Sequence, residues 1–173
     1  MLLATWNLEN LFRPGSRYGP DDERTYRAKV AALGARIADV APDVLAVQEV
    51  GDPVALDDVL KAAGGRWQVV LSEFPDERGI RVGLASRSRL ADVTQVRAFP
   101  EPVAPVQADD SGTTIAAMGR GELIDHILVS QSLVRAVVRV DTVGEPPSIG
   151  DDPELRFDEP ASDHARLLAE FDV

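Results

Sequence analysis

The feature that most constrains the fold is an apolar run near the start of the chain that ends in amides and a carboxylate. Leu2-Leu3-Ala4 leads directly into Thr5-Trp6-Asn7-Leu8-Glu9-Asn10-Leu11-Phe12. Such a run predicts a strand buried on both faces. Asn7 and Asn10 are the only asparagines in the protein, and both lie where we expect the strand to give way to a loop. Asn7 could offer its carbonyl oxygen to a hard cation or its amide N–H to a phosphate, or it could simply satisfy backbone groups.

Other polar residues also stand beside apolar runs. Val44–Val47 ends at Gln48-Glu49, Asp125 interrupts the apolar run Leu123–Ser130, and Ser162-Asp163-His164 opens the last apolar run. A carboxylate next to a buried strand is costly unless it is paired or bound to a metal. The three carboxylates of these segments, together with the first asparagine, form an oxygen-rich set that would suit Mg²⁺.

The chain contains no cysteine and only two histidines, His126 and His164. Disulfides, thiolate metal sites and cysteine nucleophiles are therefore excluded. His164 directly follows Asp163, so on a strand the two side chains would point to opposite faces, and they can share a site only at the mouth of the strand. The structural alternative is that Asp163 caps a turn and that His164 is a partly buried histidine with satisfied polar atoms.

The order of the expected elements favours an α/β layered domain. Asp21 or Asp22 can cap a helix, and Asp52-Pro53 and Gly64-Gly65 can start and stop a second one. The buried face of the first helix is expected to contain residues at steps of four and three: Tyr26, Val30, Leu33, Ile37 and Val40. Later strands are expected at Trp67–Leu71, Ile80–Ser86, Val93–Phe99, Thr113–Met118, Leu123–Ser130, Val134–Val140 and Ala165–Phe171.

The charge balance bears on partners and location. The net charge is −11, whereas a generic nucleic-acid binder would carry a basic face. A clustered acidic site that holds a divalent cation fits this balance better. No apolar run approaches the length of a membrane span, and no basic segment precedes the short apolar run at the N-terminus. We therefore expect a cytoplasmic protein that does not enter a membrane.

Four of these segments resemble, in the same order, the motifs of the endonuclease/exonuclease/phosphatase (DNase I-like) family. Trp6–Phe12 is similar to its N-terminal motif, and Val47-Gln48-Glu49-Val50 to its second. Ile124–Ser130 resembles the strand whose aspartate orients the catalytic histidine, and Ser162-Asp163-His164 resembles the terminal motif. The resemblance implies two packed β-sheets flanked by helices, a four-layer α/β/β/α sandwich, here in a shortened version.

The resemblance also implies roles for individual residues. Glu49 would be the main ligand of Mg²⁺, with Asn7 and Asp163 also in the metal set and Mn²⁺ as a substitute ion. Asp125 would pair with His164, which would act in acid/base catalysis or stabilise the transition state. The implied catalytic set is thus His164, Asp125, Asp163 and Asn7. The substrate would be a phosphodiester, in nucleic acid or in a small phosphorylated compound.

One motif of the family is missing. Its central Gly-Asp-x-Asn cannot be present, because asparagine occurs only at positions 7 and 10. The interval between Arg87 and Leu123 is also too short for the strands that carry this motif. We therefore expect one domain over residues 1–173 that lacks the central strands around residues 119–122. Lost strands leave unpaired sheet edges, which can promote self-association.

Two functions follow from this pattern. The first is a Mg²⁺-dependent phosphoesterase or nuclease-like hydrolase of phosphodiester bonds, with impaired catalysis. The alternative is a non-catalytic remnant that keeps the fold and a weak cation site. The absent Gly-Asp-x-Asn favours the remnant, and the matching motifs favour the hydrolase. A structural domain with coincidental motifs is disfavoured, because four motifs stand in the right order.

Overall fold

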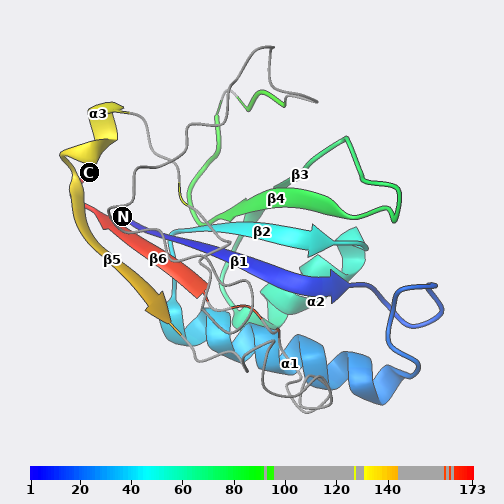
Figure 1. The fold of residues 1–173 in the computed structure, drawn as a ribbon. Helices are drawn as coiled ribbons and strands as arrows, with labels where there is room; N and C mark the ends of the chain where they lie inside the picture. Colours follow the sequence, from blue (N-terminus) through cyan, green and yellow to red (C-terminus); the bar gives the residue numbers. More distant parts are fainter. Residues whose placement is uncertain (92, 96–126, 128–130, 144–161, 163, 165) are drawn as a thin grey trace, which may run out of the picture.

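A computed structural model describes residues 1–91, 93–95, 127, 131–143, 162, 164 and 166–173. Its elements are β1 (Leu2–Leu11), α1 (Glu23–Val40), β2 (Val44–Val50), α2 (Pro53–Ala63), β3 (Gln68–Leu71), β4 (Arg81–Ser86), α3 (Gln131–Val134), β5 (Val137–Val143) and β6 (Arg166–Phe171). The strands form one six-stranded sheet in the order β3-β4-β2-β1-β6-β5, and α1 and α2 lie against it (Figure 1). The predicted α/β class is confirmed.

The sheet is mixed. β1 and β2 are parallel, and every other neighbouring pair is antiparallel. β6, the last strand of the chain, lies between β1 and β5, so the first and last strands are neighbours in the sheet. The second sheet of the expected four-layer sandwich is not found within the described residues, which supply one sheet and its helical layer.

The helices begin where the sequence predicts. The carboxylate of Asp22 accepts the backbone N–H of Thr25 at 2.7 Å, so Asp22 is the cap of α1. Asp52 caps α2 by accepting the backbone N–H of Val54 at 2.8 Å, with proline in the first turn. Ala41 caps the C-terminal end of α1: it adopts a left-handed conformation, and its N–H donates to the carbonyl oxygen of Ile37.

The main core lies between the helices and one face of the sheet. Trp6 and Leu8 from β1 and Val47 from β2 are at most 1% exposed and contact the helical layer. The two helices pack closely at Gly34, where an added Cβ would lie 2.6 Å from the Cβ of Ala62. Buried residues of this core are Ala4, Trp6, Leu8, Leu11, Tyr26, Leu33, Ile37, Leu45, Val47, Val50, Ala55, Leu56, Val59, Leu60, Ala63 and Ala85.

Some strand predictions were wrong in position. The strand expected at Val134–Val140 begins only at Val137, because a short helical turn, α3, precedes it. Residues 93–95 of the expected strand Val93–Phe99 are not in a strand, nor is Ile127 of Leu123–Ser130. The other residues of those two strands, and all of Thr113–Met118, lie outside the described part of the chain. None of the helices in the described ranges has the length and apolar character needed to cross a bilayer.

Candidate active site at the ends of the two parallel strands

The candidate site lies where β1 and β2 both depart from regular strand geometry. In a regular strand, core residues alternate with residues of the other face. Here Leu8 and Leu11 both lie in the core, three positions apart, and so do Val47 and Val50. The pairing of the two strands shifts at the same level. Between the pairs Asn7–Gln48 and Leu11–Val50, β1 has two more residues than β2, and β2 in turn has one more residue than β4 between Val47 and Val50, as in a β-bulge. β1 therefore continues past Asn7 instead of ending as the sequence suggested.

The extra residues adopt a conformation that side chains rarely tolerate. Glu9, Asn10 and Glu49 have φ values of 51°, 48° and 58°, in the left-handed region. Asparagine accepts this region more readily than other residues, whereas a glutamate there is strained by about 1–3 kcal/mol. Strain of this kind persists only where surrounding contacts hold it, and it is concentrated at functional sites.

The strained turn directs the Glu49 carboxylate toward β1. Its Oε1 accepts a hydrogen bond from Nδ2 of Asn7 at 3.2 Å, and its Oε2 accepts the backbone N–H of Asn10 at 2.8 Å. The structure thus brings together Asn7 and Glu49, which lie 42 positions apart in the sequence. Each carboxylate oxygen receives one of these bonds and retains a further lone pair that could face a cation.

The amide of Asn7 is oriented by bonds at both ends. Its Oδ1 accepts the backbone N–H of Glu9 at 2.8 Å, while its Nδ2 donates to Glu49. These two bonds assign the oxygen and the nitrogen of the amide. Because the carbonyl oxygen already accepts one hydrogen bond, the amide acts in this structure mainly as the group that positions Glu49.

A lysine that the sequence analysis did not single out supports the same turn. Nζ of Lys29, on α1, donates to the backbone oxygen of Glu9 at 2.5 Å and lies 3.8 Å from Oε2 of the Glu9 carboxylate. The Lys29 side chain is only 18% exposed. No sequence signal could have found it, because its role depends on the tertiary packing of α1 against β1.

The terminal motif is attached to β1 by hydrogen bonds that span almost the whole sequence. Oγ of Ser162 donates to the backbone oxygen of Asn7 at 2.6 Å and accepts the backbone N–H of His164 at 3.1 Å. Nε1 of Trp6 donates to the backbone oxygen of His164 at 2.8 Å. Ser162 and Trp6 are 2% and 1% exposed, so these bonds are shielded from water. His164 therefore stands at the mouth of β6, beside the strand that carries Asn7.

Two further polar groups lie at the edge of this arrangement. Nη1 of Arg78, from the loop between β3 and β4, lies 3.4 Å from Oδ1 of Asn10. Gln48 donates to the hydroxyl of Thr5 at 2.9 Å, while its own Oε1 is buried and has no hydrogen-bond partner among the described residues. An unpaired buried acceptor is uncommon, and it leaves an unused oxygen next to Asn7 in the register of the sheet.

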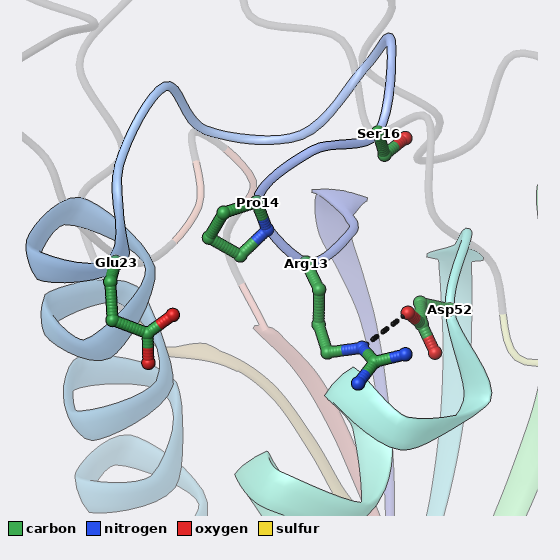
Figure 2. A pocket seen from close by; sticks show the side chains of 5 residues that line it. All are labelled: Arg13, Pro14, Ser16, Glu23 and Asp52. Carbon is green, nitrogen blue, oxygen red and sulfur yellow. Dashed lines mark hydrogen bonds and ion pairs between the residues drawn. The ribbon is translucent and has the colours of Figure 1, made fainter.

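An open pocket of about 380 Å³ lies beyond the end of β1, between the first turns of α1 and α2 (Figure 2). Figure 2 shows Arg13 and Asp52 facing each other across one side of it, joined by a bond of 2.6 Å from Nε to Oδ2. Burial alone would raise the pKa of Asp52, but the hydrogen bonds from Arg13 and from the backbone of Val54 outweigh it and lower the pKa. Ser16, Pro14 and Glu23 complete the lining.

The remaining site residues proposed from the sequence are not described. Asp125 and Asp163 lie outside the described residues, so their placement relative to His164 stays a prediction. Within the part of the chain that the structure covers, no three His, Asp or Glu side chains gather as a metal cluster. Among the metal ligands proposed from the sequence, the described oxygen donors are the carboxylate of Glu49 and the amide of Asn7.

Comparison with known proteins gives two findings. A model described as the Endonuclease/Exonuclease/phosphatase family matches residues 4–113. Among solved structures, the chain is similar to a humanized D. rerio TDP2 carrying 14 mutations, with 20% sequence identity and a TM-score of 0.35. That similarity covers 50% of this chain and 30% of the other. No curated protein matches the chain.

Proposed function

Because the chain belongs to the endonuclease/exonuclease/phosphatase family, we propose that it is a slow, Mg²⁺-dependent hydrolase of phosphodiester bonds. One observation carries this proposal. The Glu49 carboxylate is held by Asn7 and Asn10 at the ends of two parallel strands, next to the backbone-anchored segment of His164. A carboxylate placed by a strained turn has a cost in stability that a purely structural role does not explain.

The described donors fit a magnesium ion. Mg²⁺ keeps several waters and is usually bound by one or two carboxylates together with substrate phosphate. Glu49 supplies one rigid carboxylate, and in this proposal Asp163 supplies a second group, with Asn7 near the metal shell. When bound, the ion would neutralise charge on the phosphate. Mn²⁺, which accepts similar oxygen ligands, is expected to substitute.

The chain's own residues would bind and orient the substrate. The backbone of His164 accepts a hydrogen bond from the Trp6 side chain of β1 and donates one to the Ser162 hydroxyl. Asp125 is proposed to accept a bond from the His164 imidazole and fix its tautomer. In that role His164 would transfer a proton or stabilise charge on the phosphate. The guanidinium of Arg78, beside Asn10, is suited to a phosphate oxygen.

The substrate class follows from charge. A net charge of −11 repels a long polyanion at low ionic strength, so we favour short nucleic acids or small phosphodiesters over long duplex DNA. The missing Gly-Asp-x-Asn removes a group that would position the attacking nucleophile. Misplaced reactants forfeit much of the roughly 7–11 kcal/mol that positioning can supply, so slow turnover is expected.

The second candidate is a non-catalytic domain that retains the cation site. The same missing motif favours it, because phosphate neutralisation without a positioned nucleophile does not complete hydrolysis. The two candidates differ in one measurable respect. Both bind Mg²⁺ at Glu49, but only the first hydrolyses a phosphodiester in a way that depends on that residue.

The test combines Mg²⁺ titration by calorimetry with hydrolysis of bis(p-nitrophenyl) phosphate. We expect weak Mg²⁺ binding and slow hydrolysis in the native chain, and loss of both in Glu49→Gln, which can still accept the N–H of Asn10. Glu73→Gln, an exposed carboxylate on the β3–β4 loop, is the matched control and should change neither. Binding without hydrolysis would establish the non-catalytic candidate. Mg²⁺ binding that survives Glu49→Gln would refute both.

A further inference from the structure

The strand β5 forms one edge of the sheet. It is last in the strand order and pairs with β6 on one side only (Figure 1). From Arg139 to Val143 this pairing is regular, with consecutive residues opposite consecutive residues. No strand within the described residues pairs with its outer side. A regular edge of this length presents a row of N–H and C=O groups that can accept another strand.

The opposite edge of the sheet is covered by a later segment of the chain, whereas no described segment covers the outer side of β5. β3 has only four residues, and its outer side is met by a later segment of the same chain. Gln68 exchanges hydrogen bonds with the backbone of Leu90, and Nε2 of Gln95 donates to the backbone oxygen of Leu71. Short length and a covering segment are the devices that normally prevent edge-to-edge pairing.

The side chains of β5 favour pairing rather than oppose it. The strand contains neither lysine nor proline, the residues that commonly block an edge. Val138 and Val140 are 61% and 56% exposed. Its two charged residues, Arg139 and Asp141, form an ion pair with each other, so the strand carries no net charge of its own.

We propose that β5 pairs in antiparallel fashion with β5 of a second copy, about a two-fold axis at Val140. In this register Arg139 lies opposite Asp141 of the partner subunit, and Asp141 lies opposite the partner subunit's Arg139. The two exposed Val140 side chains then meet at the axis. Opposite charges and β-branched residues directly across a ladder stabilise it, whereas like charges destabilise it.

The charges select this register over its alternatives. An axis at Arg139 or at Asp141 would set two like charges directly opposite each other. A parallel, in-register pair would set like charges opposite each other at both Arg139 and Asp141. Only the axis at Val140 satisfies both charged residues of each copy. The interface is self-complementary, as a two-fold dimer requires, and it does not depend on the proposed hydrolase activity. A single strand pair buries little area, so the dimer should be weak and concentration-dependent.

The experiment is a concentration series of the full chain by sedimentation velocity at constant ionic strength. The native chain should show monomer–dimer exchange. Arg139→Asp and Asp141→Arg each place like charges at both symmetric positions, and each should weaken dimerisation about tenfold or more. An equimolar mixture of the two variants should regain a dimer, because every opposite pair is then complementary.

Arg135→Asp is the matched control, since Arg135 is exposed just before β5 and has no opposite residue within the paired strands. It should dimerise like the native chain, and far-UV circular dichroism should show that all variants are folded. A native chain that stays monomeric throughout the series would overturn the proposal. So would single variants that dimerise normally, or a mixture that does not recover.

Discussion

The substitution Ser162→Ala tests whether the terminal motif is anchored to β1 as the structure indicates. The Ser162 hydroxyl is 2% exposed and makes two hydrogen bonds, of 2.6 Å to the backbone oxygen of Asn7 and of 3.1 Å from the backbone N–H of His164. Alanine removes both and leaves two backbone groups without these partners in a site shielded from water. Each lost bond contributes about 1 kcal/mol, and a buried unpaired group costs roughly 1–3 kcal/mol.

We therefore expect Ser162→Ala to lower the free energy of unfolding by about 2–4 kcal/mol, measured by urea denaturation with an unchanged m-value. Amide hydrogen exchange at His164 should accelerate as well, because its N–H loses the Ser162 oxygen. The matched control is Ser16→Ala, at a partly exposed serine whose hydroxyl accepts a bond of 3.3 Å from the backbone N–H of Tyr18. If the two variants proved equally stable, the anchoring role of Ser162 would be refuted.

Two further predictions concern the helical layer and the pocket. Gly34→Ala places a Cβ 2.6 Å from the Cβ of Ala62. The overpacking costs about 1–3 kcal/mol, which should exceed the gain of about 1 kcal/mol in helix propensity. Thermal unfolding should therefore show a lower Tm, and an unchanged or higher Tm would contradict the prediction. The pKa of Asp52 is lowered in the folded chain, so its contribution to stability is present above its unfolded pKa and lost as pH falls through the folded value. Stability measured between pH 5 and pH 2 should therefore fall less steeply in Asp52→Asn, and an identical slope would remove Asp52 from the pH response.

The sequence predicted those parts of the fold that depend on local chemistry. Asp22, one of two candidates for the first cap, and Asp52 do cap their helices, because capping needs only a short side chain and a following helical face. The buried face of α1 followed from its apolar spacing. Tyr26, Leu33 and Ile37 are indeed buried, whereas Val30 is partly buried. These features can be predicted because residues close in the sequence determine them.

The details of the candidate site depended on contacts that no local pattern records. The pairing of Asn7 with Glu49 was predicted only in outline. The left-handed conformation of Glu9 and Glu49 runs against the preference of glutamate, and it is held by groups from distant segments. Lys29 supplies one of those groups from a helix that otherwise reads as an ordinary amphipathic helix. β5 also begins later than the predicted strand, at Val137 instead of Val134, because α3 precedes it.

The position of β6 has a consequence for how the protein forms. β6 contacts β1 across almost the entire sequence, and such distant pairings are slow to form because the intervening chain must first be closed into a loop. During synthesis, β1 and β2 can pair early, but the β6 side of β1 stays open until residues 166–171 are made. A nascent chain that has not reached His164 thus lacks both the β6 partner of β1 and the His164 part of the candidate site. Assembly of that site therefore requires β6, and the open side of β1 is exposed to aggregation until β6 pairs with it.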